Sequence, residues 1–259
     1  MKRFVLSVPP GPEGMIHLYG NDYHYLVHVR RLRPGSCFDA TLPGGAETRV
    51  RVLSTADNIL IGECLDAAEQ NPQDNIPPIA LFQGLPKGTK MDLIIRQAAE
   101  GGVSVVAPFE SEYSTVRLKQ DSRKLQRWER IVREARQQSG SSVETVVRPP
   151  AGFDDLLVYW ESLKKKYQKP VGILLHQEPL ENGTFHGYLG SCPDFVALAV
   201  GPEGGFSPGE VSLFLAAGFR ALLMGNTILR TETAALYGTA VIRIILLENE
   251  SWAPKGSCS

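Results

Sequence analysis

Several features are missing from this 259-residue chain, and each absence excludes a class of protein. No stretch approaches the roughly 18 consecutive apolar residues of a membrane-spanning helix. The first eight residues run into Pro9, Pro10 and Pro12, a pattern that predicts no signal peptide. The few cysteines form no Cys-x-x-Cys pair and have no histidine at metal spacing, so we expect reduced thiols and no metal site. They are Cys37, Cys64, Cys192 and Cys258. Together these absences favour a cytoplasmic protein.

A strong charge of either sign is also missing, because 27 basic and 28 acidic residues give a formal net charge of −1. Nucleic-acid-binding domains are usually basic overall, so the balance by itself argues against an RNA partner. The average conceals a local excess: residues 117–136 carry eight basic and three acidic side chains. Such a run is either a solvated helix face or a surface that contacts RNA.

Length and patterning predict two domains of different type. Residues 1–72 contain short alternating apolar runs separated by turn residues, which is typical of a small β-barrel or sandwich. A helix is expected over 22–33, with Tyr25, Val29 and Leu32 on one face. Three prolines in the segment 71–78 indicate a linker. The predicted strands are 4–8, 36–42, 48–53 and 59–65.

Residues 79–250 change to an alternation of strands and helices. The strand predicted at Phe195–Val200 is apolar throughout, as in a parallel sheet whose two faces are both covered by helices. We therefore predict an α/β domain. Its strands are expected at 79–82, 103–107, 145–147, 171–175, 195–200 and 221–224. Its helices are expected at 87–101, 121–138, 153–165, 208–217 and 231–247.

In open parallel sheets, ligands bind beyond the carboxyl ends of the strands. The segment 201–206 follows such a strand and holds three glycines, whose backbone can approach a ligand closely. A helix start with a capping box is then predicted from Ser207, Pro208 and Glu210. The end of that helix is predicted at Gly218. The loop lacks the lysine and spacing of phosphate-binding motifs, and Glu203 would repel a phosphate. A cofactor with an adenosine or a positive centre fits better, and a structural turn is the alternative.

A second strand end carries apolar and charged residues together. Ile228 and Leu229 in a loop indicate an apolar slot of the kind that an adenine occupies. Thr231 is expected to cap the last helix, with Glu232 in its first turn. Arg230 is either functional or a loop charge paired with Glu232. The last helix is apolar nearly all round, which predicts burial on several sides by a core, a knot or a dimer interface.

Two segments, 198–207 (Leu-Ala-Val-Gly-Pro-Glu-Gly-Gly-Phe-Ser) and 228–234 (Ile-Leu-Arg-Thr-Glu-Thr-Ala), carry a family resemblance. In this order and spacing they resemble the paired signature of the RsmE family, the 16S ribosomal RNA (uracil-N3) methyltransferases of the trefoil-knotted SPOUT superfamily. The similarity extends to segments 28–35, 87–92, 98–103 and 127–139, and so covers nearly the whole chain.

The resemblance implies a fold, a cofactor and partners. It implies a PUA-like RNA-binding β-barrel over residues 1–72 and a SPOUT methyltransferase domain with a trefoil knot over residues 79–250. It also implies S-adenosylmethionine as cofactor, 16S ribosomal RNA of the small ribosomal subunit as substrate, and a homodimer. The implied cofactor-binding residues are Leu175, His176, Val200, Gly201, Pro202, Glu203, Gly204, Gly205, Met224, Gly225, Ile228, Leu229, Arg230 and Thr233.

We expect catalytic roles for Glu203, Arg230 and Glu232. Glu203 would favour the sulfonium charge, and Arg230 would stabilise a uracil anion or hold a phosphate. Glu232 is expected to orient Arg230 rather than act as a base, because a carboxylate beside an arginine has a lowered pKa. His176 is the other titrating residue at a strand end, and a lone histidine is more often structural. The expected RNA contacts are Arg31, Arg33, Lys90, Arg117, Arg123, Arg127 and Arg130.

Two departures from the family pattern affect these RNA contacts. Tyr113 and Ser141 stand where the family tends to have arginines. Two alternatives also stay open. One is a knotted 2′-O-ribose methyltransferase, and the other is a ribosome-assembly or RNA-binding factor that kept the fold and lost the activity.

Overall fold

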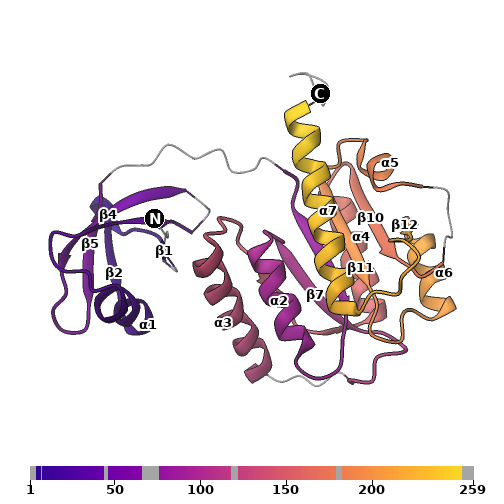
Figure 1. Ribbon diagram of the computed structural model, residues 1–259, viewed down its shortest axis with the longest axis horizontal. Coiled ribbons are helices and arrows are strands. Elements are labelled where there is room, and N and C mark those ends of the chain that lie inside the picture. Colours follow the sequence, from indigo (N-terminus) through magenta and orange to yellow (C-terminus); the bar gives the residue numbers. More distant parts are fainter. Residues whose placement is uncertain are drawn as a thin grey trace. The chain divides into compact units, whose positions relative to one another are not determined.

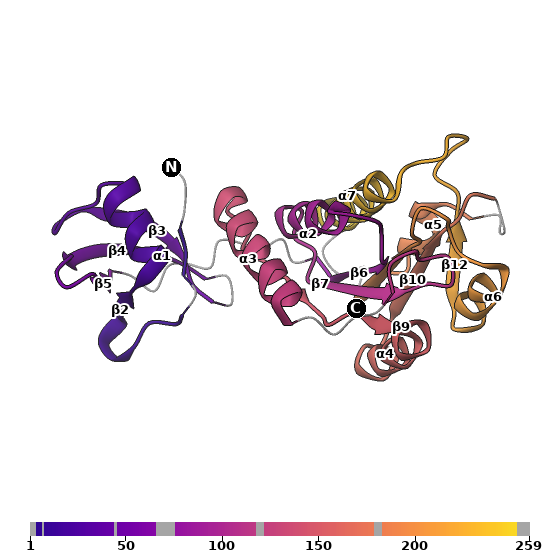
Figure 2. The same ribbon diagram turned by 90° about the horizontal axis from the view of Figure 1, so that it is seen from below.

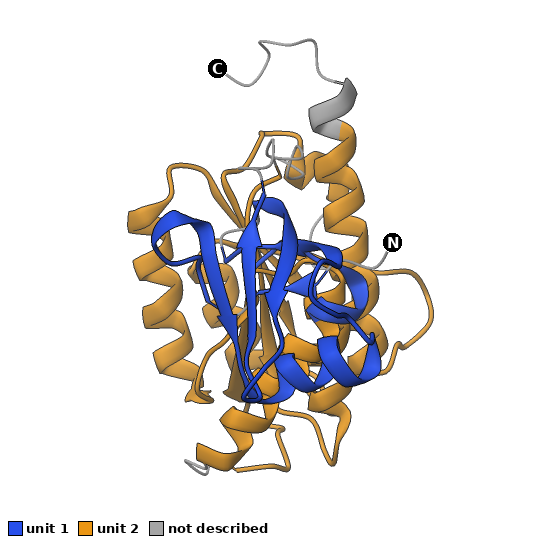
Figure 3. Ribbon diagram, turned by 90° about the vertical axis from the view of Figure 1, so that its left-hand side faces the viewer, with its two compact units in different colours: residues 1–73, 136–144 blue, residues 74–135, 145–259 orange. Residues whose placement is uncertain are grey.

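The computed structural model describes residues 4–6, 8–43, 46–65, 76–117, 122–178 and 183–252. The chain forms two compact units, coloured separately in Figure 3. Unit 1 contains residues 1–73 and 136–144, and unit 2 contains residues 74–135 and 145–259. Most of the expected linker, residues 71–75, lies outside the described residues.

Unit 1 is built on a five-stranded mixed sheet in the order β1-β3-β4-β5-β2. The β1–β3 pairing is parallel, and the other pairings are antiparallel. In β4, Thr48, Val50 and Val52 are buried while the residues between them are exposed, so the alternation read from the sequence sets the inner face. The strands are β1 (Phe4–Val5), β2 (Met15–Leu18), β3 (Cys37–Thr41), β4 (Glu47–Ser54) and β5 (Leu60–Cys64).

The helix expected over 22–33 is shorter and differently wound. A turn of α-helix, α1 (Gly20–Tyr23), continues into a π-helix over His24–Val29, where the N–H of Arg30 donates to the carbonyl of Tyr25. The wider turn shifts the inward face, so Leu26 is fully buried and Val29 is 59% exposed. Of the three residues expected on one face, Tyr25 and Leu32 pack against the core of unit 1, whereas Val29 does not.

Unit 2 contains a seven-stranded sheet, and the prediction of a parallel sheet is confirmed. The order is β12-β10-β11-β6-β7-β8, with β9 paired to β7, and every pairing is parallel. All six residues of β11 are buried, as their unbroken apolar run predicts. The strands are β6 (Ile79–Gly84), β7 (Val105–Glu110), β8 (Val146–Val147), β9 (Ala151–Gly152), β10 (Pro170–Leu175), β11 (Phe195–Val200) and β12 (Phe219–Leu222).

Helices cover both faces of this sheet (Figures 1 and 2). Side chains of α2, α3, α5 and α7 form one apolar cluster with one face of the sheet, and α4 and α6 form a second cluster with the other face. Trp128 and Trp160 are the largest fully buried side chains, one in each cluster. The helices are α2 (Lys90–Glu100), α3 (Ser122–Ser139), α4 (Phe153–Lys166), α5 (Phe185–Leu189), α6 (Pro208–Ala216) and α7 (Thr231–Trp252). Within the described part, no helix is long and apolar enough to cross a membrane.

Several short elements differ from those predicted. The sequence pattern does not predict β2, β9 or α5, which are two to five residues long and too short for a clear period. Strand β12 begins two residues earlier than predicted, because it starts directly after Gly218, whose φ of +92° ends α6. Of the four thiols expected to be reduced, Cys37 and Cys64 are free, and Cys258 lies outside the described residues. The expectation is wrong at Cys192, which is disulfide-bonded.

Helix α7 is less enclosed than its composition indicates. Ala235, Ile242, Ile245 and Leu246 are buried against the sheet and α2. A second group is exposed, with Leu236 at 36%, Tyr237 at 53% and Ile244 at 54%. Within the single chain the sheet, α2 and α5 contact this helix, and burial of its remaining exposed side chains by a partner stays a prediction.

Candidate active site

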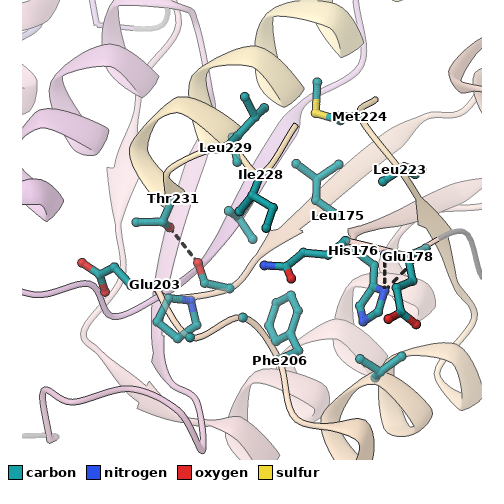
Figure 4. Close-up of a pocket in the computed structure, with 18 of the residues that line it drawn as sticks. Leu175, His176, Glu178, Glu203, Phe206, Leu223, Met224, Ile228, Leu229 and Thr231 are labelled. Carbon is teal, nitrogen blue, oxygen red and sulfur yellow. Dashed lines mark hydrogen bonds between the residues drawn. The ribbon is translucent and has the colours of Figure 1, made fainter. Parts of the chain in front are cut away.

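Three loops meet at the carboxyl ends of β10, β11 and β12, and they enclose a pocket of about 1230 Å³ (Figure 4). The loop after β11, residues 201–206, forms one wall, and the segment 223–231 forms another. Leu175, Ile228 and Leu229 supply apolar side chains, and Ile228 is 78% exposed in the chain alone. Apolar side chains beside an open backbone are typical of a small-molecule site.

Two glycines expose their backbone to this pocket. Gly205 has a φ of +72° and Gly225 a φ of +95°, which is the left-handed region that side chains other than glycine rarely adopt. Apart from the two chain neighbours, no described residue has an atom closer than 4.0 Å to the position of a Cβ at either glycine. The local turns therefore require glycine and let a ligand approach the backbone closely; the N–H of Gly205 itself donates to the carbonyl of Pro202 at 3.0 Å.

A buried chain of hydrogen bonds ties the pocket together. The Nε2 of Gln83, at the end of β6, donates to Oγ1 of Thr231 at 2.9 Å and to the carbonyl of Gly84 at 2.9 Å. Oγ1 of Thr231 in turn donates to the carbonyl of Gly201 at 2.7 Å (Figure 4). Because a carbonyl only accepts, this arrangement fixes the direction of each bond. The start of α7 is thereby attached to β6 and to the glycine loop.

Thr231 therefore has a different role from the expected helix cap. Helix α7 begins at Thr231 itself, and the hydroxyl donates to the carbonyl of Gly201.

The predicted capping box of α6 is confirmed: the side chain of Ser207 accepts from the N–H of Glu210, and the Glu210 carboxylate accepts from the N–H of Ser207. Glu210 is only 6% exposed and also accepts from the Ser111 hydroxyl and the Glu112 N–H.

Lys90 lies between two carboxylates at the edge of the pocket. Its Nζ is 2.6 Å from Oε1 of Glu203 and 3.8 Å from Oε2 of Glu232. The hydrogen bond to Glu203 raises the pKa of Lys90 above its ordinary value, and the charges of both carboxylates add to that rise. The amine of Lys90 is therefore protonated at neutral pH.

The carboxylate of Glu203 is turned away from His176 and Phe206 in Figure 4. It accepts from the backbone N–H of Lys87 at 3.1 Å as well as from Lys90. Partial burial works against its ionisation, but these hydrogen bonds outweigh it and lower the pKa of Glu203 below the ordinary value. Glu203 is thus held as a carboxylate by the start of α2.

Glu232 forms its ion pair with Lys90, and among the described residues it forms none with Arg230. The expectation that it pairs with Arg230 is wrong because the first turn of α7 turns it toward α2. Its Oε2 is buried and has no hydrogen-bond partner in the described part of the chain. Arg230 lines the pocket and is exposed.

His176 is held by its own loop. Its Nδ1 accepts from the backbone N–H of Glu178 at 3.1 Å (Figure 4). Within the described residues, no group of three or more His, Cys, Asp or Glu side chains is placed to hold a metal ion.

The structure brings the expected cofactor residues around one pocket, with one exception. Thr233 is not among the residues that line it. The pocket also has apolar lining that sequence reasoning missed, at Phe206, Val211, Leu215 and Leu223. Val211 and Leu215 lie four positions apart on α6 and therefore on the same face of the helix. This spacing could have indicated them, because a helix face beside a ligand-binding loop can also contact the ligand.

The expected RNA contacts are dispersed. Arg31 and Arg33 are exposed in unit 1, while Lys90 lies at the pocket of unit 2. On α3 the side chains of Arg123, Arg127 and Arg130 are exposed, and Trp128 between them is buried. Several of these cations are paired within the protein: Arg117 with Glu110 at 2.7 Å, Arg127 with Asp92 at 2.5 Å and Arg130 with Glu134 at 3.6 Å.

Comparison with known proteins shows what class this fold and site define. Residues 72–243 match the family model of the RNA methyltransferase domain. The ribosomal RNA small subunit methyltransferase E of Synechocystis is 32% identical over 247 residues, with 94% of this chain and 78% of the relative covered. That of Bacillus subtilis is 29% identical, with 86% of this chain and 87% of the relative covered.

A solved structure agrees. The ribosomal RNA small subunit methyltransferase E of Neisseria gonorrhoeae, bound to S-adenosyl methionine, superposes with a TM-score of 0.77 at 26% identity. The alignment covers 95% of this chain and 98% of that one. The chain therefore belongs to the ribosomal RNA small subunit methyltransferase E family.

Proposed function

We propose that this chain transfers the methyl group of S-adenosylmethionine to N3 of a specific uridine in 16S ribosomal RNA of the small ribosomal subunit. The observation that carries the proposal is the pocket at the carboxyl ends of β10, β11 and β12, with a glycine loop on one side and a fixed cation at its edge. Family membership supplies the reaction class and the substrate class. A cytoplasmic location follows from this substrate.

The pocket fits S-adenosylmethionine. Its apolar side chains, including Leu175, Ile228 and Leu229, suit an adenine, and the backbone at Gly205 and Gly225 can contact the polar parts of the molecule. The cofactor supplies an electrophilic methyl group on a sulfonium centre. Uracil N3 has to lose its proton to solvent, and the N3–methyl bond then forms as the methyl–sulfur bond breaks. The protein has to hold the uracil in line with that methyl group and to stabilise the negative charge on the deprotonated base.

We assign that stabilisation to Lys90 and Arg230. Both line the pocket, and Lys90 is kept protonated by Glu203. Glu203 and Glu232 then act as positioning residues that hold the ammonium group, in place of the sulfonium contact expected for Glu203. This assignment needs no metal ion. His176 is assigned to the cofactor wall, because its Nδ1 is already occupied by its own loop.

We propose that unit 1 is a PUA-like RNA-binding domain and that unit 2 is knotted. The mixed sheet of unit 1 and its exposed Arg31 and Arg33 support the first statement. For the second, the chain leaves β12, passes the glycine loop and enters α7, which packs on β6 and β11. Arg117, Arg123, Arg127 and Arg130 are proposed as further RNA contacts of the exposed surface.

We further propose a homodimer formed through α7. The exposed side chains of Leu236, Tyr237 and Ile244 support it, because apolar groups gathered on one helix favour a protein interface. Wild-type protein is expected to have the mass of a dimer in light scattering, and Ile244→Glu that of a monomer. Val158→Glu, on an exposed apolar position of α4, is the matched control and should stay dimeric. A monomeric wild type would refute the proposal.

The decisive experiment incubates the protein with labelled S-adenosylmethionine and small subunits that lack the modification, then maps the methylated nucleoside by mass spectrometry. Label on uracil N3 supports the proposal. Label on a ribose would instead identify a 2′-O-ribose methyltransferase. Binding of the cofactor without any transfer of label would identify an assembly factor that has lost the activity. Arg230→Ala should abolish transfer with an unchanged circular dichroism spectrum, while Arg96→Ala, an exposed arginine on α2, should keep full activity.

A further inference from the structure

Tyr113 is an exposed aromatic residue beside the glycine loop. It lies in the turn that follows β7, and 45% of its surface is accessible. A Cβ placed on Gly204 would lie 2.9 Å from Cβ and 3.7 Å from Cγ of Tyr113. The tyrosine therefore packs directly on the backbone of the loop that lines the active-site pocket, and the absence of a side chain at Gly204 makes room for it.

The turn that carries Tyr113 is fixed by hydrogen bonds on both sides of the residue. The N–H of Ser111 donates to Oγ of Ser114 at 3.1 Å, and the N–H of Ser114 donates to the carbonyl of Ser111 at 2.9 Å. The Ser111 hydroxyl and the Glu112 N–H both donate to the buried carboxylate of Glu210, at 3.0 and 2.9 Å. Since Glu210 also caps α6, the turn is locked to the helix that follows the glycine loop.

The exposed residues that flank Tyr113 in the chain are polar. Glu112, Thr115 and Arg117 are exposed, and Arg117 pairs with Glu110 at 2.7 Å. Within residues 110–117 Tyr113 is the one large hydrophobic side chain that is exposed. A protein partner usually binds to a contiguous apolar patch. A single aromatic side chain among polar groups is instead typical of a contact to an unpaired base.

We propose that Tyr113 is a stacking platform for an unpaired nucleobase of the RNA, next to the base that enters the pocket. This inference rests on the proposed function. N3 of a paired uracil is engaged in the base pair, so the target segment has to be unpaired or extruded to be methylated. An aromatic face packed on the glycine loop would stabilise that state, and it costs little ordering because the turn is already held. Tyr113 is thus a positioning residue and does not touch the reacting atoms.

The test compares wild type with Tyr113→Leu and Tyr113→Phe. Leucine keeps most of the apolar volume and loses the aromatic face, so the KM for unmethylated small subunits should rise about tenfold. Phenylalanine keeps the face and should remain within about twofold of wild type. The Kd for S-adenosylmethionine and the oligomeric mass should not change in either variant. The Kd of each protein for the same subunits, measured without cofactor, should follow the KM.

Three results would overturn the inference. The first is a leucine variant with wild-type KM and Kd for the subunits. The second is an equal loss in the phenylalanine variant, which would assign the effect to the phenolic hydroxyl. The third is a change of oligomeric mass in the leucine variant, which would assign Tyr113 to a subunit interface. If wild type transfers no methyl group, the proposed function fails, and the Kd comparison still decides whether Tyr113 contacts RNA.

Discussion

The hydrogen bonds between Gln83, Thr231 and Gly201 give a prediction with a definite sign. Thr231→Val keeps the shape of the side chain and removes both functions of the hydroxyl. Gln83 is fully buried, so one N–H of its amide then lacks an acceptor, which costs about 1–3 kcal/mol. The Gly201 carbonyl also loses a donor, a net loss of about 0.5–1.5 kcal/mol. We expect unit 2 to lose about 1.5–4.5 kcal/mol of its free energy of unfolding.

Gln83→Leu should cost far less. It removes the amide donor together with Oε1, a buried oxygen that has no hydrogen-bond partner among the described residues. The double variant should then be no less stable than Thr231→Val alone, because the leucine eliminates the unpaired N–H that the valine creates. The expected coupling free energy between the two sites is about 1–3 kcal/mol.

Urea unfolding followed by tryptophan fluorescence measures this coupling, because Trp128 and Trp160 are both buried in unit 2. Calorimetric titration measures the Kd of the variants for S-adenosylmethionine. In Thr231→Val the hydrogen bond between the start of α7 and the Gly201 carbonyl is lost, so both walls of the pocket are held less firmly. We expect Thr231→Val to weaken binding. Effects of the two substitutions that add within about 0.5 kcal/mol would refute the reasoning.

Two further predictions concern the same pocket. Gly84→Ala would place a Cβ 2.6 Å from Cδ and 2.7 Å from N of Pro202, so the glycine loop must move. The Kd for S-adenosylmethionine should therefore rise at least tenfold. An unchanged Kd would contradict the packing described. The pKa of Glu203 is lower in the folded protein than in the unfolded chain, and that of Lys90 is higher, so their pairing stabilises the protein at neutral pH. This contribution is lost as the pH falls through the folded-state pKa of Glu203 or rises through that of Lys90. The difference in Tm between wild type and Lys90→Met should therefore shrink toward pH 3, and a constant difference from pH 7 to 3 would exclude the pairing as its cause.

Local patterns predicted the framework of the site. The apolar run of β11 gave a strand buried on both faces, and the Ser207–Glu210 spacing gave the capping box. Each of these signals acts over a few neighbouring residues. The loops at the strand ends could be placed in one pocket because parallel strands direct their carboxyl ends to the same edge of the sheet.

The contacts that complete the site join distant parts of the chain. Gln83 and Thr231 are separated by 148 positions, and Lys90 and Glu203 by 113. No period or motif relates such residues, so the sequence suggested a partner for Glu232 within its own turn, at Arg230. The fold instead places the first turn of α7 against α2, and the closer cation is Lys90.

The net charge of −1 is compatible with an RNA substrate once the charges are located. Two of the acidic residues that lower the total, Glu203 and Glu232, hold the lysine that we assign to the anionic base. Other carboxylates pair with exposed arginines, such as Glu110 with Arg117. These acids orient cations and do not form a repulsive surface. The net charge is −1, and three of the arginines proposed as RNA contacts pair with carboxylates, so we expect the protein to neutralise few phosphates and its affinity for RNA to depend only weakly on salt. Specificity then has to come from shape and from contacts to unpaired bases, which is the work proposed for Tyr113.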